Sequence, residues 1–273
     1  AYVRISNDIM TDSARRSIWV VDSATGAQSP LETGDMPFMA PRWSPDGSRL
    51  AYVSSSPMGA QIYVRWMGTG RSARVANLEQ APNDIAWSPD GKTLAFTMLV
   101  PDEGRTLAPG LPRPEGAKWA EPLKVIDRVT FRADGEGFLK PGYRQVFAVS
   151  AEGGQPRQLT FGPFDVSGPI HFNRAGDAVL FSSNRAANWE RDPQEAEIFQ
   201  ASLAGSPAVV QLTSRVGPDV APTPSPDGSK IAYVGYDDAR RRGYENQRLY
   251  VMDALGRNSR VLTGGLDRSV SAP

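Results

Sequence analysis

The chain has 273 residues, 40% of them hydrophobic, and carries 30 basic and 30 acidic side chains. This length supports one or two domains with a substantial core, and the balanced charge argues against nucleic acid or anionic lipid as a partner. No apolar run is long enough for a membrane helix, and the absence of cysteine excludes disulfides, thiolate nucleophiles and cysteine-based zinc sites. The 26 glycines and 23 prolines separate short β-rich runs, which indicates an all-β chain.

A five-residue motif recurs along the chain and sets its period. Trp-Ser-Pro-Asp-Gly occupies 43–47 and 87–91, and diverged copies occupy 131–135, 172–176 and 224–228. In Ser-Pro-Asp-Gly, proline presets the backbone of a type I turn, serine and aspartate can bond nearby backbone, and glycine can close the turn without steric cost. The motif therefore predicts a tight turn between two strands, repeated about every 40 to 50 residues, a period typical of propeller blades.

A second and a third strand are predicted after four of the turns, and a fourth strand in most repeats. Apolar runs follow the turns at 50–53, 94–97, 179–182 and 231–234. Third strands are expected at 61–64, 145–149, 198–201 and 249–253, and fourth strands at 157–160, 210–213 and 260–263. The second strands are apolar on both faces, as in a sheet covered on both sides. We therefore expect a β-propeller of four-stranded antiparallel blades.

The two ends of the chain carry parts of the repeat. Residues 1–3 match the second strand at 51–53, and 18–22 match a third strand, so we expect the chain to start inside a blade. Residues 269–273 occupy the position just before another repeat motif. We expect residues 1–273 to form an incomplete ring of about six blades. The 85 residues between Trp87 and Phe172 fit two blades or one blade with a large insertion, and two are favoured.

The connections between the second and third strands vary in length, whereas the other turns within a repeat are short. Because successive strands alternate in direction, the short and the variable connections must emerge on opposite faces. Variable loops on a rigid scaffold often carry function. Two of these connections, at 184–197 and 237–247, are rich in charged residues. Five of their side chains are candidates for contact with a substrate: Trp189, Glu195, Glu197, Arg241 and Tyr244. The alternative is that these residues are solvated surface charge. The proline-rich stretch at 101–122 is interpreted as a surface excursion.

Other motifs favour structural interpretations. His171 is the single histidine and lies in a strand-like context, so packing is preferred to catalysis. Residues 68–73 fit a loose dinucleotide-binding pattern, but they join two strands and begin no helix. No cluster has the spacing of a metal site, and no cofactor is expected.

These repeats resemble those of TolB-like proteins and of the N-terminal propellers of prolyl oligopeptidase family serine peptidases. Three segments are similar to the bacterial acylaminoacyl-peptidase and dipeptidyl-aminopeptidase branch: Gly-Ala-Lys-Trp-Ala at 116–120, Val-Ile-Asp-Arg at 125–128 running into 134–138, and Gly-Gly-Gln-Pro-Arg-Gln-Leu-Thr at 153–160. The resemblance implies a periplasmic or secreted protein rather than a cytoplasmic one.

The resemblance also implies a function and two partners. In that family the propeller covers an α/β-hydrolase domain that holds the catalytic serine, aspartate and histidine, and it admits peptide substrates. No Gly-x-Ser-x-Gly string occurs here, so no catalytic residue is assigned, and the hydrolase domain is expected downstream in the same chain. The expected function is a non-catalytic propeller that filters or positions peptides. The alternative is a TolB-like protein interaction propeller with no attached enzyme.

Overall fold

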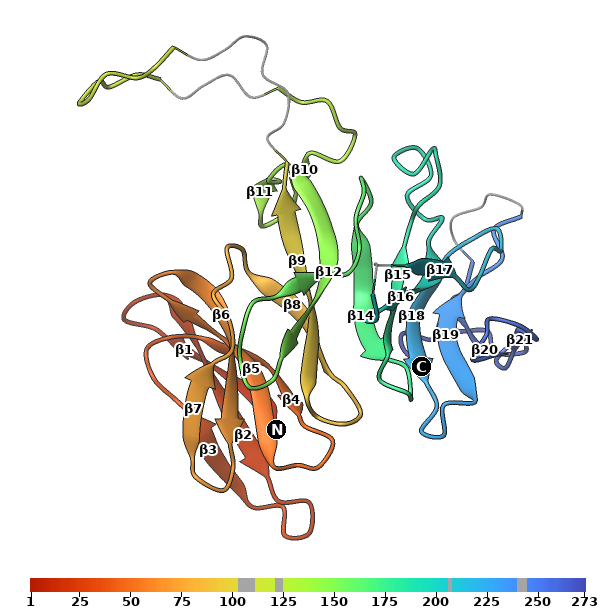
Figure 1. Cartoon of the computed structure of the whole chain (residues 1–273), viewed down its shortest axis with the longest axis horizontal. Helices are drawn as coiled ribbons and strands as arrows, with labels where there is room; N and C mark the ends of the chain where they lie inside the picture. Colours follow the sequence, from red (N-terminus) through yellow and green to blue (C-terminus); the bar gives the residue numbers. More distant parts are fainter. Residues whose placement is uncertain (103–110, 121–124, 206–207, 240–244) are drawn as a thin grey trace.

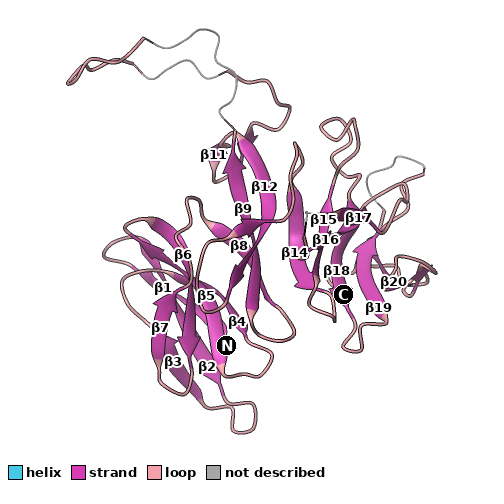
Figure 2. Ribbon diagram, in the orientation of Figure 1, coloured by secondary structure: helices cyan, strands magenta, loops and turns pink. Residues whose placement is uncertain are grey.

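The computed structural model describes residues 1–102, 111–120, 125–205, 208–239 and 245–273 (Figure 1). Within these ranges the regular structure consists of β-strands, with no helix (Figure 2). In particular, the described ranges hold no long apolar helix of the kind that crosses a membrane. The all-β fold expected from the sequence is confirmed.

Five antiparallel sheets follow one another along the chain as propeller blades, and in each of them consecutive strands are neighbours. Blade 1 has three strands: β1 (Tyr2–Asp8), β2 (Ser13–Val21) and β3 (Gln28–Glu32). Blade 2 consists of β4 (Phe38–Trp43), β5 (Arg49–Ser56), β6 (Gly59–Trp66) and β7 (Arg71–Arg74). Blade 3 consists of β8 (Pro82–Trp87), β9 (Thr93–Pro101), β12 (Gly142–Ser150) and β13 (Arg157–Gln158).

The last two blades repeat this four-stranded pattern. Blade 4 consists of β14 (Val166–Phe172), β15 (Ala178–Ser183), β16 (Glu197–Ser202) and β17 (Val209–Gln211). Blade 5 consists of β18 (Asp219–Pro224), β19 (Lys230–Gly235), β20 (Arg248–Asp253) and β21 (Arg260–Val261). The blades form an open arc with blades 1 and 5 at its two ends (Figure 1).

The stretch between Trp87 and Phe172 corrects one expectation, because it forms one blade and not two. Strands β9 and β12 pair directly from Gly142↔Pro101 to Ser150↔Thr93, so residues 102–141 are an insertion between the second and third strands of blade 3. The diverged motif at 131–135 does form a turn, between β10 (Arg132–Ala133) and β11 (Gly137–Phe138). These two strands form a separate hairpin that pairs with no other described strand, so they are not a blade.

The core lies in layers between neighbouring blades. On β5, Leu50 and Tyr52 belong to the layer shared with blade 1, whereas Ala51 and Val53 belong to the layer shared with blade 3. Alternate residues of a strand point to opposite faces, so a strand covered on both sides is apolar at each position. Each large apolar side chain that is fully buried contributes about 1.5–3 kcal/mol to folding.

A stacked aromatic pair connects the second and third strands of every four-stranded blade. In blade 4, Phe181 and Phe199 are direct partners across β15 and β16, with ring centroids 5.7 Å apart. Equivalent pairs lie in blades 2, 3 and 5: Tyr52 with Tyr63, Phe96 with Phe147, and Tyr233 with Tyr250. Positions in different blades can therefore be compared by counting residues from these pairs.

The first strand of each four-stranded blade contains a register shift at a residue with positive φ. This residue is Ala40 in β4 (φ 50°), Asp84 in β8 (φ 50°), Gly168 in β14 (φ 74°) and Ala221 in β18 (φ 56°). A non-glycine residue is strained in this left-handed region. Blades 2, 3 and 5 therefore keep a bulge that glycine would form at lower cost.

The predicted turns join the first and second strands of blades 2 to 5, as expected. In the 44–48 turn, the amide of Gly47 donates to the carbonyl of Ser44 at 2.9 Å. The Ser44 hydroxyl donates to Asp46 Oδ1 at 2.6 Å and accepts from the amide of Arg49 at 2.9 Å. The Ser44 hydroxyl first, and then the hydroxyl and amide of Ser48, donate to the Asp46 carboxylate and hold its pKa well below its usual range. Thus the repeat motif is a closed hydrogen-bonded unit.

The other turns reproduce this unit. The same serine and aspartate bonds occur in the turns at 88–92 and 225–229. In the 173–177 turn, Asn173 takes both roles, since its Oδ1 accepts from the amides of Gly176, Asp177 and Ala178 at 3.0–3.2 Å. One asparagine therefore replaces the serine and the aspartate, and the turn still joins the first and second strands of its blade.

Successive turns also pack on one another. A Cβ atom placed on Gly176 would lie 3.3 Å from Pro89 Cδ, and one placed on Gly228 would lie 2.3 Å from Arg174 Cβ. Both glycines have positive φ, 77° and 74°. A Cβ on Gly47, in the first of these turns, would meet no atom within 4 Å. Between blades 4 and 5, glycine is therefore required for close approach as well as for backbone conformation.

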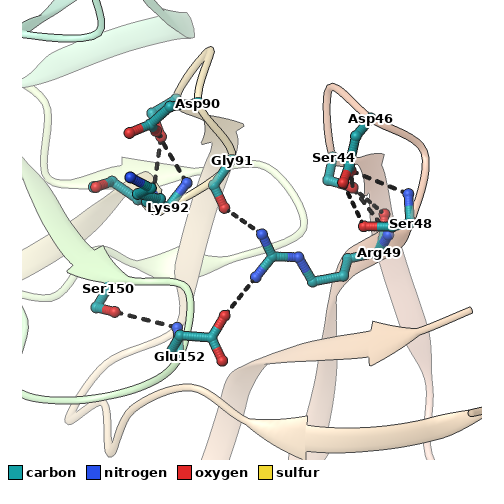
Figure 3. A network of polar contacts seen from close by, with 11 residues as sticks. Ser44, Asp46, Ser48, Arg49, Asp90, Gly91, Lys92, Ser150 and Glu152 are labelled. Carbon is teal, nitrogen blue, oxygen red and sulfur yellow. Dashed lines mark hydrogen bonds and ion pairs between the residues drawn. The ribbon is translucent and has the colours of Figure 1, made fainter.

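One arginine connects the turns of blades 2 and 3 (Figure 3). Arg49 donates from Nη2 to the carbonyl of Gly91 at 2.6 Å, and its Nη1 lies 2.7 Å from Glu152 Oε1. The guanidinium carbon also lies 5.1 Å from the centroid of the Trp87 ring. The Arg49 side chain is 13% exposed and that of Glu152 71% exposed, so the bond to Gly91 and the stacking contribute more than the ion pair.

Candidate functional site

The second-to-third-strand connections emerge on one face of the arc, together with the segments that link one blade to the next. We call this the long-connection face, and its connections are residues 102–141, 184–196 and 236–247. The opposite face, with the motif turns, is the short-turn face. In Figure 1 the described part of the 102–141 insertion and the 184–196 connection extend beyond the upper ends of blades 3 and 4. This separation of faces agrees with the expectation from strand alternation.

Trp189 connects two long connections. Its ring lies edge-on to Tyr143 of β12, with centroids 6.3 Å apart and an interplanar angle of 75°. The guanidinium carbon of Arg128 lies 4.1 Å from the centroid of the same Tyr143 ring, and Arg128 Nη1 donates to the carbonyl of Gly142 at 2.9 Å. Tyr143 of β12 thereby contacts both Arg128 of the blade 3 insertion and Trp189 of the 184–196 connection, through a cation–π contact and an edge-on aromatic contact.

The two candidate glutamates have different surroundings. Glu195 is half-buried and accepts a hydrogen bond from the amide of Gly217 at 3.1 Å, in the segment that leads into blade 5. Glu197, the first residue of β16, is only 8% exposed and accepts from the Thr213 hydroxyl. Burial, with smaller contributions from the carboxylates of Asp219 and Glu195, raises the pKa of Glu197 to about 7. Glu197 is therefore a buried carboxyl at the base of the connection and not an exposed surface charge.

The position of Glu197 in the blade explains this burial. Measured from the stacked aromatic pair, Glu197 is equivalent to Gln61 in blade 2 and Gln145 in blade 3. The Gln145 amide nitrogen donates to the carbonyls of Gly162 and Phe164 at 3.1 and 3.0 Å. An ionised glutamate cannot donate such bonds, whereas a protonated one can donate one of them.

An ion pair lies beside Glu197 at the junction of blades 4 and 5. Arg215 Nη2 pairs with Asp219, which is fully buried, and Arg215 Nη1 donates to the Tyr250 hydroxyl at 2.7 Å. The Arg215 guanidinium carbon lies 4.1 Å from the centroid of the Tyr250 ring. Tyr236 is also buried, and burial, with smaller contributions from Asp238, Asp192 and Glu195, raises its pKa. Buried ionisable groups thus lie beneath the long-connection face.

The five sequence candidates are only partly placed together. Trp189, Glu195 and Glu197 all belong to one connection and its continuation into β16. Arg241 and Tyr244 lie outside the described residues, and their contact with a substrate stays a prediction from the sequence. Sequence reasoning missed Tyr143, Arg185 and Arg215. A signal for Glu197 was present, because glutamine precedes the corresponding aromatic residue by two positions in blades 2 and 3.

A hollow lies along the first strands of blades 2, 3 and 4. It has a volume of about 520 Å³, and its lining includes Arg42, Trp43, Asp84, Trp87 and His171. Burial, with a smaller contribution from Arg42, lowers the pKa of His171. The lining contains no serine or threonine that His171 could activate. His171 is half-buried on β14, as the packing interpretation expected.

Two family models match different parts of the chain. Residues 1–107 match the TolB β-propeller domain, and residues 115–231 match the dipeptidyl peptidase IV N-terminal region. The second match includes the described part of the insertion after residue 114 and the whole 184–196 connection. The resemblance stated from the repeat motifs is confirmed.

Curated relatives include peptidases. The uncharacterized peptidase YuxL of Bacillus subtilis is 29% identical over 185 residues, covering 67% of this chain and 27% of YuxL. Dipeptidyl-peptidase 5 of Porphyromonas gingivalis is 22% identical over 268 residues, covering 93% of this chain and 38% of the relative. The chain thus spans less than two fifths of the length of either peptidase.

A solved structure shows the same fold over nearly the whole chain. Acylaminoacyl peptidase of Pyrococcus horikoshii superposes with a TM-score of 0.73 at 19% identity, covering 99% of this chain and 38% of that one. At this identity the likeness concerns the fold. The β-propeller domain of the trilobed protease from Pyrococcus furiosus, with a TM-score of 0.59 over 98% of this chain, supports the assignment of the five sheets to a propeller.

Proposed function

We propose that this chain, a TolB-like β-propeller of the peptidase type, is the non-catalytic propeller of a serine peptidase and filters or positions peptides for an α/β-hydrolase domain of the same protein. The match of residues 115–231 to the dipeptidyl peptidase IV N-terminal region carries this proposal. The matched segment holds the 184–196 connection, where aromatic and ionisable side chains gather.

The long-connection face is the proposed substrate side. Its connections differ in length from blade to blade, so they can be adapted to a ligand without change to the blade core. Trp189 and Tyr143 provide aromatic surface, and Glu195 provides a half-buried carboxylate able to attract an amino group of a peptide. On the short-turn face, the polar side chains of the motif turns already form hydrogen bonds within those turns.

Charge reversal in the full-length protein tests this assignment. Glu195→Lys is expected to change kcat/KM for peptides with a free amino terminus by about fivefold or more, with a smaller effect on end-blocked peptides. Lys92→Glu, an exposed change on the short-turn face, is the control and should leave both values unchanged. Changes below about twofold for both peptide types would identify Glu195 as ordinary surface and contradict the substrate-side assignment.

The TolB match of residues 1–107 supports a second candidate, a protein interaction propeller without an enzyme. The two candidates differ in what the parent gene encodes after Pro273. A Gly-x-Ser-x-Gly string followed by aspartate and histidine within roughly 300 residues selects the peptidase. A stop codon soon after one further blade selects the interaction propeller.

A further inference from the structure

Arg185 is the second residue of the 184–196 connection, two residues after the end of β15. Its guanidinium carbon lies among three phenyl rings, 5.2 Å from the centroid of Phe199, 5.6 Å from Phe164 and 5.7 Å from Phe181. The Nε and Nη2 atoms are buried and have no hydrogen-bond partner among the described residues. The third guanidinium nitrogen, Nη1, is not among the buried atoms and the residue is only partly buried, so Nη1 is the atom that a ligand on the long-connection face can reach.

Three other arginines of the described residues lie over rings and are paired with a carboxylate. The pairs are Arg49 over Trp87 with Glu152, Arg128 over Tyr143 with Asp102, and Arg215 over Tyr250 with Asp219. Arg4 over Trp19 is exposed, so water can satisfy its guanidinium. Arg185 is both partly buried and, among the described residues, without an acidic partner. Burial lowers its pKa, which shows that its charge is not compensated locally.

The surroundings of Arg185 select the type of anion. A guanidinium matches a carboxylate in shape and hydrogen-bonding capacity. Phe181 and Phe199 are themselves buried, so these rings fix the position of the guanidinium and do not contact a ligand. The carboxyls of Glu195 and Glu197 lie at the other end of the same connection, where Ser183 pairs with Glu197, and they disfavour a multiply charged anion such as a phosphate.

We propose that Arg185 binds a carboxylate group of a peptide ligand at the mouth of the β15–β16 hairpin. That the ligand is a peptide rests on the proposed function. The need for a carboxylate rests on the unpartnered guanidinium alone. The site would distinguish acidic from neutral peptides, a selectivity separate from any recognition of an amino terminus by Glu195.

Calorimetric titration of the full-length protein with matched peptides tests the proposal. Ac-Ala-Phe-Glu-Ala-amide and Ac-Ala-Phe-Gln-Ala-amide differ only in a side-chain carboxylate. Ac-Ala-Phe-Ala with a free carboxyl terminus and its amide form test whether Arg185 binds a terminal carboxylate instead of a side-chain carboxylate. The expected result is binding roughly fivefold or more tighter for one carboxylate probe than for its amide partner. Mass spectrometry after each titration confirms that the peptides remain intact.

Three variants assign the difference to Arg185. Arg185→Met should reduce the difference between paired probes to less than about twofold, and Arg185→Lys should retain part of it. Arg191→Met, an exposed change in the same connection, should retain all of it. The Tm of each variant shows whether it is folded, and the comparison of probes on the unmodified protein does not depend on any variant.

Equal binding of both members of each pair to the unmodified protein would overturn the proposal, and so would a difference that persists in folded Arg185→Met. Absence of binding by all four probes, with a lower Tm for Arg185→Met, would make Arg185 a structural residue and likewise overturn it. The kcat/KM values of Glu195→Lys report on the proposed function separately. A selective Arg185 site together with an inert Glu195 would therefore reject the amino-terminus role without rejecting the carboxylate site.

Discussion

The two faces of the arc use polar side chains in different ways. On the short-turn face, serine, asparagine and aspartate satisfy backbone amides within their own turns, and the glycines allow one turn to pack on the next. On the long-connection face, Glu197 is buried, and two buried nitrogen atoms of Arg185 have no hydrogen-bond partner in the described part of the chain. The comparison indicates that one face maintains the scaffold, while the other holds charged groups that are costly unless a ligand or a proton compensates them.

The largest expected effect comes from adding a methyl group between two turns. Gly228→Ala should lower the free energy of unfolding by about 2–4 kcal/mol, because its Cβ would lie 2.3 Å from Arg174 Cβ in a left-handed backbone conformation. Gly47→Ala shares the backbone strain but meets no atom within 4 Å, so about 1 kcal/mol is expected. Denaturant unfolding measures both. Equal losses would show that turn packing between blades adds nothing.

The arginine that connects blades 2 and 3 is expected to have a smaller effect. Arg49→Met should cost about 1–2 kcal/mol, because it removes the bond to the Gly91 carbonyl and the stacking on Trp87. Glu152→Gln should cost less than about 0.5 kcal/mol, since the Glu152 side chain is 71% exposed. Urea midpoints of the two variants test the ranking. A larger loss for Glu152→Gln would assign the effect to the ion pair instead.

The buried carboxyl of the long-connection face should make stability depend on pH. The pKa of Glu197 is raised from 4.5 to about 7, so its favourable contribution is complete below pH 4.5 and is lost as the pH rises through 7. Glu197→Gln supplies the amide found at the equivalent Gln145 and should be more stable than the unmodified protein at pH 8 by about 1–2 kcal/mol.

Unfolding curves at pH 5 and pH 8 measure this effect, and Glu152→Gln is the exposed control. At pH 5 the advantage of Glu197→Gln should be small. An advantage of the same size at both pH values would show that shape, and not ionisation, separates the two side chains.

The smallest effect is expected at the bulges of the first strands. Ala40→Gly should raise the free energy of unfolding by about 0.5 kcal/mol, because φ is 50° at Ala40. The reverse change at the equivalent position, Gly168→Ala with φ 74°, should lower it by about 1 kcal/mol. Thermal unfolding of the two variants compares them directly. Shifts of the same sign would contradict the strain interpretation.

The blade pattern could be predicted because its signals are local. Proline and glycine at fixed positions determine the turn, and the apolar run that follows Gly47 or Gly91 can form only a strand covered on both faces. The position of the long connections on one face follows from strand alternation. The single blade between Trp87 and Phe172 could not be predicted, because the 131–135 segment has the local features of a repeat turn. Only the pairing of β9 with β12 shows that a blade does not form there.

The sequence by itself determined the propeller fold, the turn positions and the face on which variable connections emerge, since each depends on residues that are neighbours along the chain. The tertiary structure decided which charged side chains are exposed. Glu195 and Glu197 are alike in sequence, but the backbone amide of Gly217 reaches one, and packing between blades 4 and 5 buries the other. Arg185 gave no sequence signal, because its three phenyl neighbours come from separate segments of the chain. Burial depends on such distant contacts, and burial determines whether an ionisable group is ordinary surface or part of a site.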